Sequence, residues 1–191
     1  MQANWPSVLY PQAAIAAAGL GGAWRRWRAP AAGLGFALTA LVWVQGIWAP
    51  APLPRRLDIT AMRLAGWDAM AAEVTAAARR EGAHYVVADN YGQAAELAWR
   101  MPADIPVLAL DTRWYWFDLP SAAEMVIGQP GLMLRSDRLV DQPHTSDFAH
   151  PAELGEIARG RGGMVAERLR FYRVVGRAGF EPIVVLPRPR R

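Results

Sequence analysis

The chain has 191 residues, of which 53% are apolar and 20% are charged, so it is long enough for one modest folded domain and is not a disordered polymer. It contains no cysteine, which excludes disulfide bonds, thiolate metal sites and cysteine nucleophiles. All 21 basic residues are arginine, which excludes a Schiff-base or P-loop lysine. From residue 58 onward 16 arginines face 17 acidic residues, a net charge of −1, so the sequence predicts no nucleic-acid partner.

Two uncharged stretches near the N-terminus predict membrane helices. Residues 31–49 would span about 28 Å as a helix, close to the hydrocarbon thickness of a bilayer. The alternative is a buried core helix, but core helices are usually shorter and carry polar residues on part of their circumference. Residues 8–24 also lack charge, and their small side chains suit packing against other membrane helices. We therefore predict that residues 1–50 form a transmembrane helical hairpin at the end of a larger membrane domain, with membrane lipid as a partner.

The arginines of the RRWR turn at residues 25–28 favour the cytoplasmic side of the membrane, which places residues 51–191 outside the cytoplasm. These arginines follow the first apolar stretch rather than preceding it, so that stretch does not resemble a signal peptide. The sequence therefore predicts a membrane protein with an extracytoplasmic C-terminal domain. A soluble enzyme with a buried helical hairpin is the least favoured alternative.

The proline-rich segment APAPLP at residues 49–54 favours extended backbone and marks a domain boundary near residue 50. A helix is then predicted from Trp67, because apolar residues recur at intervals of three and four and Gly82 supplies a C-terminal stop. The apolar positions of this helix are Trp67, Met70, Ala71, Val74 and Ala78.

A strand, a helix and a second strand follow. Residues 84–89 and 106–110 are short apolar runs typical of buried strands, and the helix between them begins at Asn90 as N-cap and ends at Pro102. This order is a βαβ unit with a parallel pair of strands, so the predicted class of residues 51–191 is α/β.

The remaining residues predict a strand at 131–135, a polar loop from 136 to 151 and a helix near 151–159. The runs at 166–175 and 181–187 flank GRAGF and predict a C-terminal β-hairpin.

No cofactor is predicted, because neither GLGG at 19–22 nor GRGG at 160–163 follows a strand and opens a helix, and no Walker motif exists. Aspartate and histidine residues recur every three positions in the polar loop and could hold a divalent ion. Prolines bound this segment, so it reads as a solvated loop and we predict no metal site. The residues concerned are Asp141, His144, Asp147 and His150.

Polar residues follow both strands of the βαβ unit, where α/β folds place functional groups. Asp89, Asn90 and Tyr91 follow the first strand, and Asp111, Thr112 and Arg113 follow the second, so the two clusters should be neighbours. Arg113 precedes four aromatic residues, a composition that suits sugar rings, lipid headgroups or a protein surface. The alternative is a structural role: Asp89 caps the helix, Arg113 pairs with Asp118, and the aromatic residues pack on the membrane domain.

GWDAMAAEV at 66–74 and VVADNYGQAAELAWRMPADIPVLALDTRWYWFDL at 86–119 resemble the C-terminal region of bacterial membrane glycosyltransferases. These are the dolichyl-phosphate-mannose protein mannosyltransferase-like and aminoarabinose-transferase-like enzymes. The NWP motif at Asn4–Pro6 also resembles their late membrane segment.

This resemblance implies a polyprenyl-phosphate-linked sugar as donor and a glycan, lipid or protein as acceptor. It implies a catalytic acid in an early extracytoplasmic loop of the membrane domain, to which no residue here can be matched, so the chain by itself should be inactive and could act beside a separate catalytic membrane polypeptide. Substrate-binding or domain-docking candidates at recurrent positions are Asp89, Asn90, Tyr91, Arg113 and Asp118. The alternative function is a non-catalytic, membrane-anchored binding or assembly module that recognises a glycan or protein.

Overall fold

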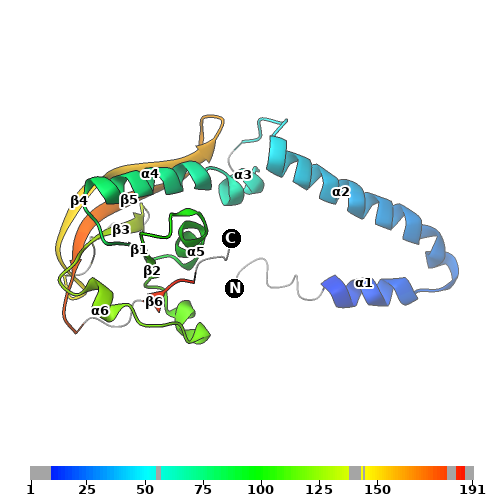
Figure 1. Cartoon of the computed structure of the whole chain (residues 1–191). Coiled ribbons are helices and arrows are strands. Elements are labelled where there is room, and N and C mark those ends of the chain that lie inside the picture. Colours follow the sequence, from blue (N-terminus) through cyan, green and yellow to red (C-terminus); the bar gives the residue numbers. More distant parts are fainter. Residues whose placement is uncertain (1–9, 55–56, 138–142, 144, 180–183, 188–191) are drawn as a thin grey trace. The chain divides into compact units, whose positions relative to one another are not determined.

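The computed structural model describes residues 10–54, 57–137, 143, 145–179 and 184–187 (Figure 1). The chain divides into two compact units, Met1–Pro52 and Leu53–Arg191. The division lies two residues beyond the expected boundary at residue 50, within the proline-rich segment.

The first unit is helical. It contains α1 (Tyr10–Gly19), the 3-10 helix η2 (Gly22–Trp27) and α2 (Arg28–Trp48), and Gln45 is the one buried residue of α2. Among the described residues one helical stretch, Gly22–Trp48, is long and apolar enough to cross a membrane, judged by length and composition alone. The ten residues of α1 reach about 15 Å, half of a hydrocarbon layer. Of the two predicted membrane helices, the described residues therefore provide one candidate.

The second unit contains a mixed sheet whose six described strands are ordered β4-β5-β3-β1-β2-β6. The central strand β1 (Tyr85–Ala88) pairs in parallel with β2 (Val107–Ala109) and β3 (Pro130–Ser136). Antiparallel pairs join β5 (Met164–Gly176) to β3 and to β4 (Phe148–Arg161), and β6 (Val184–Val185) to β2. The predicted α/β class and the parallel β1–β2 pair of the βαβ unit are confirmed.

Helices α3 (Ile59–Leu64), α4 (Trp67–Arg80) and α5 (Tyr91–Arg100) pack on one face of this sheet (Figure 1). The buried side of α4 includes all five predicted apolar positions, and the chain turns at Gly82 with a positive φ of 63°. Asn90 caps α5 as predicted, since its side-chain oxygen accepts hydrogen bonds from Gly92 N at 2.9 Å and Gln93 N at 3.4 Å. Local sequence patterns therefore predict α4 and α5 of this layer, whereas α3 was not predicted.

The other face of the sheet has a second apolar core. It contains Tyr85, Met133, Phe148 and Tyr172, and it is covered in part by α6 (Ala123–Val126) through Val126. Burial raises the pKa of Tyr85 to about 12 and raises the pKa of Tyr172 as well. Apolar side chains thus cover both faces of the sheet. Polar groups lie at the edge formed by the carboxyl ends of β1, β2 and β3.

The predicted helix near residues 151–159 is wrong, because these residues lie in strand β4. The strand pairs with β5 along most of its length and contains three register irregularities. Its hairpin turn is formed by Gly162 and Gly163, with positive φ values of 57° and 81°, a geometry that glycine adopts without strain. Pairing with β5, which follows directly after this turn, overrides the local helical composition.

The predicted C-terminal β-hairpin is also wrong. β5 is already paired on both edges, by β3 and β4, so it offers no open edge to the residues that follow it. The chain instead reaches the opposite edge of the sheet, where Val184 pairs with Ala109 and Val185 with Leu108.

Candidate functional site

A buried ion pair joins the ends of β1 and β3. Asp89 Oδ2 lies 3.4 Å from Arg135 Nε, and the side chains are 15% and 8% exposed. From β1 the chain continues to β2 on one side, whereas from β3 it continues to β4 and β5 on the other. Asp89 and Arg135 therefore occupy the topological switch point, where α/β sheets commonly bind ligands. The expectation that Asp89 caps α5 is wrong, since Asn90 does so.

Arg113 joins the ends of β1 and β2. Its guanidinium donates to both carboxylate oxygens of Asp111, at 2.9 and 2.8 Å, and its Cζ lies 3.7 Å from the centre of the Tyr91 ring. The predicted proximity of the two strand ends is thus confirmed. The Arg113 hydrogen bond lowers the pKa of Asp111, while the same bond raises the pKa of Arg113. Asp111 is therefore a fixed negative charge rather than a general base poised near neutral pH.

The expected pairing of Arg113 with Asp118 is wrong, because Asp111 lies two residues away and holds the guanidinium with both oxygens. Asp118 instead ends the 3-10 helix η3 (Thr112–Phe117) in the left-handed region, with a φ of 48°. Trp116 is 88% exposed and Phe117 is 65% exposed. The site thus combines one stacked cation with exposed aromatic rings.

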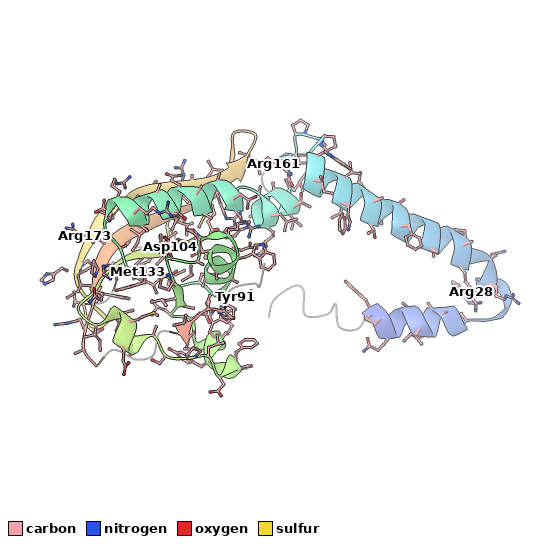
Figure 2. All side chains as sticks on the ribbon, in the orientation of Figure 1. Arg28, Tyr91, Asp104, Met133, Arg161 and Arg173 are labelled. Carbon is pink, nitrogen blue, oxygen red and sulfur yellow. The ribbon has the colours of Figure 1, made fainter. Side chains whose placement is uncertain are left out.

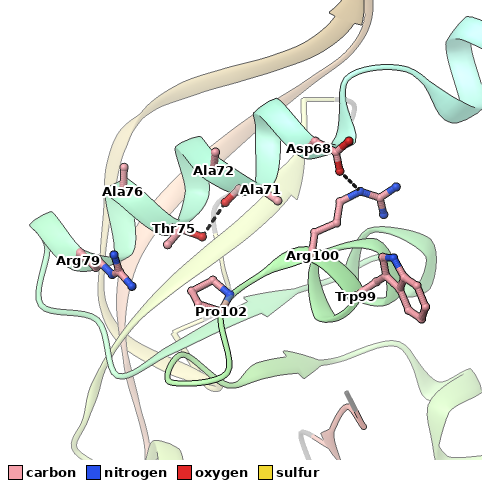
Figure 3. Close-up of a pocket in the computed structure, with 9 residues that line it drawn as sticks. All are labelled: Asp68, Ala71, Ala72, Thr75, Ala76, Arg79, Trp99, Arg100 and Pro102. Atoms are coloured by element: carbon pink, nitrogen blue, oxygen red, sulfur yellow. Dashed lines mark hydrogen bonds and ion pairs between the residues drawn. The ribbon is translucent and has the colours of Figure 1, made fainter. Parts of the chain in front are cut away.

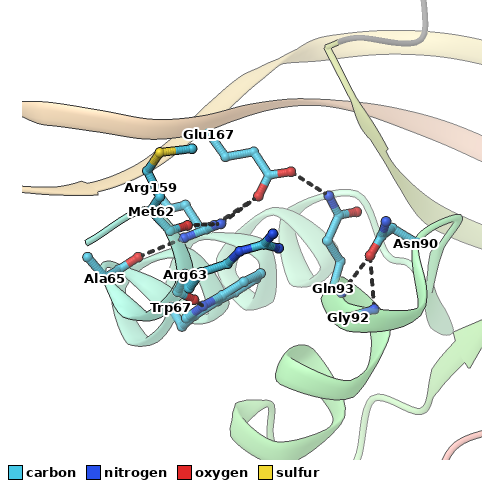
Figure 4. Close-up of polar contacts among 9 residues, drawn as sticks. All are labelled: Met62, Arg63, Ala65, Trp67, Asn90, Gly92, Gln93, Arg159 and Glu167. Carbon is cyan, nitrogen blue, oxygen red and sulfur yellow. Dashed lines mark hydrogen bonds and ion pairs between the residues drawn. The ribbon is translucent and has the colours of Figure 1, made fainter. Parts of the chain in front are cut away.

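A polar pocket of about 410 Å³ lies beside the N-terminus of α5. Glu167 organises it: one carboxylate oxygen accepts from Gln93 Nε2 at 3.0 Å and the other from Arg159 Nε at 2.9 Å (Figure 4). Arg159 also donates to the backbone oxygens of Met62 and Ala65, and it stacks 4.1 Å above Trp67. The lining residues are Met62, Arg63, Trp67, Asn90, Tyr91, Gly92, Gln93, Glu96, Arg159, Ala166 and Glu167.

This pocket offers fixed donors, fixed acceptors and an aromatic edge, which are the groups that recognise a polyhydroxylated ligand. Gln93 is 3% exposed, and its side-chain oxygen accepts no hydrogen bond from any described residue. Tyr91, which is 45% exposed, both lines the pocket and stacks on Arg113, so it links the two parts of the site. Figure 2 shows Tyr91 at this end of the second unit.

Sequence reasoning missed the two buried arginines of this edge. Arg135 interrupts the apolar run GLMLR, which is the signal of a buried, paired charge. Arg159 and Glu167 are direct cross-strand partners in the β4–β5 hairpin. Reading the Gly162–Gly163 pair as a hairpin turn, rather than testing it only as a nucleotide loop, would have brought them together.

A second cavity, of about 570 Å³, lies between α4 and α5 (Figure 3). Small side chains line the α4 side, and Trp99 and Pro102 line the other. Its two arginines are engaged by nearby carboxylates, Arg100 with Asp68 at 2.7 Å and Arg79 with Asp104 at 3.5 Å. This cavity therefore brings no reactive grouping to the candidate site.

Within the part of the chain that the structure describes, no three His, Asp or Glu residues are grouped to hold a metal ion. Of the four loop residues considered, Asp141 and His144 lie outside the described residues, and His150 lies in β4 with a φ of 53°.

Comparison of the chain with protein-family models, with curated proteins and with solved structures finds no match.

Proposed function

We propose that this chain is the C-terminal portion of an integral-membrane glycosyltransferase that uses a polyprenyl-phosphate-linked sugar donor. The segments that carry the resemblance, 66–74 and 86–119, contribute α4, β1, α5, β2 and η3 to the second unit. In this proposal residues 7–49 form two membrane helices in the bacterial inner membrane, and residues 51–191 form the extracytoplasmic domain. The catalytic acid belongs to a region outside this chain or to a separate membrane polypeptide.

The observation that carries the proposal is the stacking of Arg113 on Tyr91 at the rim of a polar pocket. A guanidinium held by one carboxylate keeps donors for a phosphate or hydroxyl, and the adjoining pocket offers both donors and acceptors to a sugar. The carboxylates of Asp89 and Asp111 are both engaged by arginines. The site is therefore suited to binding an acceptor or a lipid headgroup, and catalysis requires groups from elsewhere.

The test is sugar transfer from a labelled polyprenyl-phosphate donor in membranes of cells that lack the chain and are complemented with variants. We expect Tyr91→Ala and Arg113→Ala each to reduce transfer at least tenfold at equal membrane abundance, because each removes one half of the stacked pair. Arg173→Ala, on exposed β5 surface, is the matched control and should retain full transfer. Unchanged transfer in both site variants would remove the proposed binding role.

The second candidate function is a non-catalytic, membrane-anchored module that binds a glycan or protein. The exposure of Trp116 and Phe117 favours it, because large aromatic side chains on a surface are typical of recognition sites. Full sugar transfer in membranes that lack the whole chain would favour this function over the transferase.

A further inference from the structure

Three large aliphatic side chains, two in α3 and one just before it, are exposed and take no part in the candidate site. Leu57 and Ile59 are each 67% exposed and Leu64 is 63% exposed, all within eight residues. Scattered exposed leucines are ordinary, but such a cluster next to a charged side chain marks an interaction surface. The cluster of Leu57, Ile59 and Leu64 is called the α3 outer surface.

The opposite side of α3 is fixed to the second unit. Asp58 is 5% exposed, caps the helix by accepting from Ala61 N at 2.9 Å, and lies 3.6 Å from Arg161. Arg159 donates to the backbone oxygens of Met62 and Ala65, at the carboxyl end of the same helix. Ala61 is fully buried, and at about 100° per residue Ile59 lies about 160° away from it around the helix. Leu64, at the last position of α3, is 63% exposed. The outer surface is thus presented by a rigid element.

Only a short stretch of sequence, residues 49–56, separates the last residue of α2 from the first residue of this surface. The side chain of Gln45 pairs with the backbone of Ala51, donating to its oxygen at 2.9 Å and accepting from its nitrogen at 3.3 Å. The backbone nitrogens of Leu57 and Asp58 both donate to Pro54 O. Three Cα-to-Cα steps separate Ala51 from Pro54, so the Cα atoms of these two residues lie at most about 11 Å apart.

We infer that the α3 outer surface lies in the headgroup region of the bilayer that α2 crosses and holds the second unit against the membrane. The inference rests on the proposed function only in requiring α2 to be a membrane helix. Apolar side chains next to arginine suit the boundary between acyl chains and anionic headgroups. The sequence adds Arg55 and Arg56 immediately before Leu57. We favour a bilayer as the partner of this surface, because a short linker to a membrane helix requires no second protein.

The absence of cysteine allows a direct test by single-site labelling. The full chain carrying Leu64→Cys is labelled with an environment-sensitive fluorophore and reconstituted in vesicles of phosphatidylethanolamine and phosphatidylglycerol. The matched control is Arg173→Cys, exposed on β5 at the end of the β4–β5 ribbon remote from Arg161 (Figure 2). We expect lipids with a spin label near the headgroup to quench the label at 64 at least threefold more than the label at 173. A water-soluble iodide quencher should show the reverse order.

A second experiment places the fluorophore at position 57 instead of position 64. With the fluorophore on Leu57→Cys, the substitutions Ile59→Glu and Leu64→Glu place two charges on exposed positions and should abolish the lipid quenching. Equal quenching at 64 and 173, in chain that resists carbonate extraction, would overturn the inference while leaving the membrane anchor intact. Quenching that depends on protein concentration rather than on lipid would assign the surface to a second copy and also overturn it. Release of the chain by carbonate would overturn both the inference and the anchor, whereas the transfer assay tests the glycosyltransferase function separately.

Discussion

Replacing Arg159 by methionine should lower the free energy of unfolding of the second unit more than a comparable substitution on its surface. The Arg159 side chain is 6% exposed, and its guanidinium joins Glu167, two backbone oxygens at the end of α3 and the ring of Trp67. Methionine keeps much of the side-chain volume but provides no donor. The substitution therefore leaves a partly buried carboxylate with Gln93 as its remaining donor, and two carbonyl groups without their charged partner.

The expected loss follows from these contacts. Removing one member of a buried ion pair costs about 3–5 kcal/mol, and hydrogen bonds from a charged donor contribute about 1.5–3 kcal/mol each without being additive. The Glu167 side chain is 21% exposed, so water compensates part of the lost partner. We expect a decrease of about 3 kcal/mol in the free energy of unfolding, at the lower end of that range. Adding Glu167→Gln removes the unpaired charge and should restore about 1–2 kcal/mol.

The measurement is urea unfolding of the full chain in detergent, followed by circular dichroism of the sheet. Arg168→Met is the matched control, because Arg168 lies on the same hairpin and forms a 3.7 Å ion pair with Glu156 in which both side chains are 53% exposed. Such a surface pair contributes about 0–1 kcal/mol. A cost of Arg159→Met no larger than that of Arg168→Met would refute the reasoning that Arg159 holds α3, β4 and β5 together.

Two further predictions concern single residues of the second unit. The folded-state pKa of Tyr85 is about 12, above the unfolded value of 10.0. The contribution of the protonated phenol to stability is therefore fully present below pH 10. It is lost as the pH rises from 10 toward 12, by about 1.4 kcal/mol per pH unit for one proton. Tyr85→Phe should reduce the slope of unfolding free energy against pH in this window by one proton, and an unchanged slope would contradict the assignment. Asn90→Ala should lower the free energy of unfolding in urea by about 1 kcal/mol, because Asn90 caps α5. Asn90→Asp keeps an acceptor and should lower it by less than half as much. Equal losses in the two variants would argue against the cap.

Much of the helical layer could be predicted from local pattern. The buried positions of α4 repeat with the period of a helix, and Asn90 and Pro102 bound α5 because one caps a helix and the other cannot continue it. The parallel pairing of β1 and β2 follows because a helix of this length carries the chain back over the sheet. The proximity of Tyr91 and Arg113 follows in turn, since neighbouring parallel strands end at the same edge.

The partners of the charged residues could not be predicted in the same way. Arg113 has acidic residues at positions 111 and 118, and only the turn of η3 decides that Asp111 holds it. Asp89 meets Arg135 because β1 and β3 are adjacent, a pairing of strands that are more than forty residues apart. No local pattern contains that information.

By itself, the sequence determined the apolar N-terminal segment, the boundary in the proline-rich stretch and the βαβ unit, because each depends on residues close together in the chain. Only the tertiary structure decided that β6 joins the edge of β2 and that Arg159 and Glu167 anchor a pocket. The physical reason is that strand pairing is decided by which edges remain open once the rest of the sheet has formed. Helical periodicity and capping, in contrast, act over a few neighbouring residues.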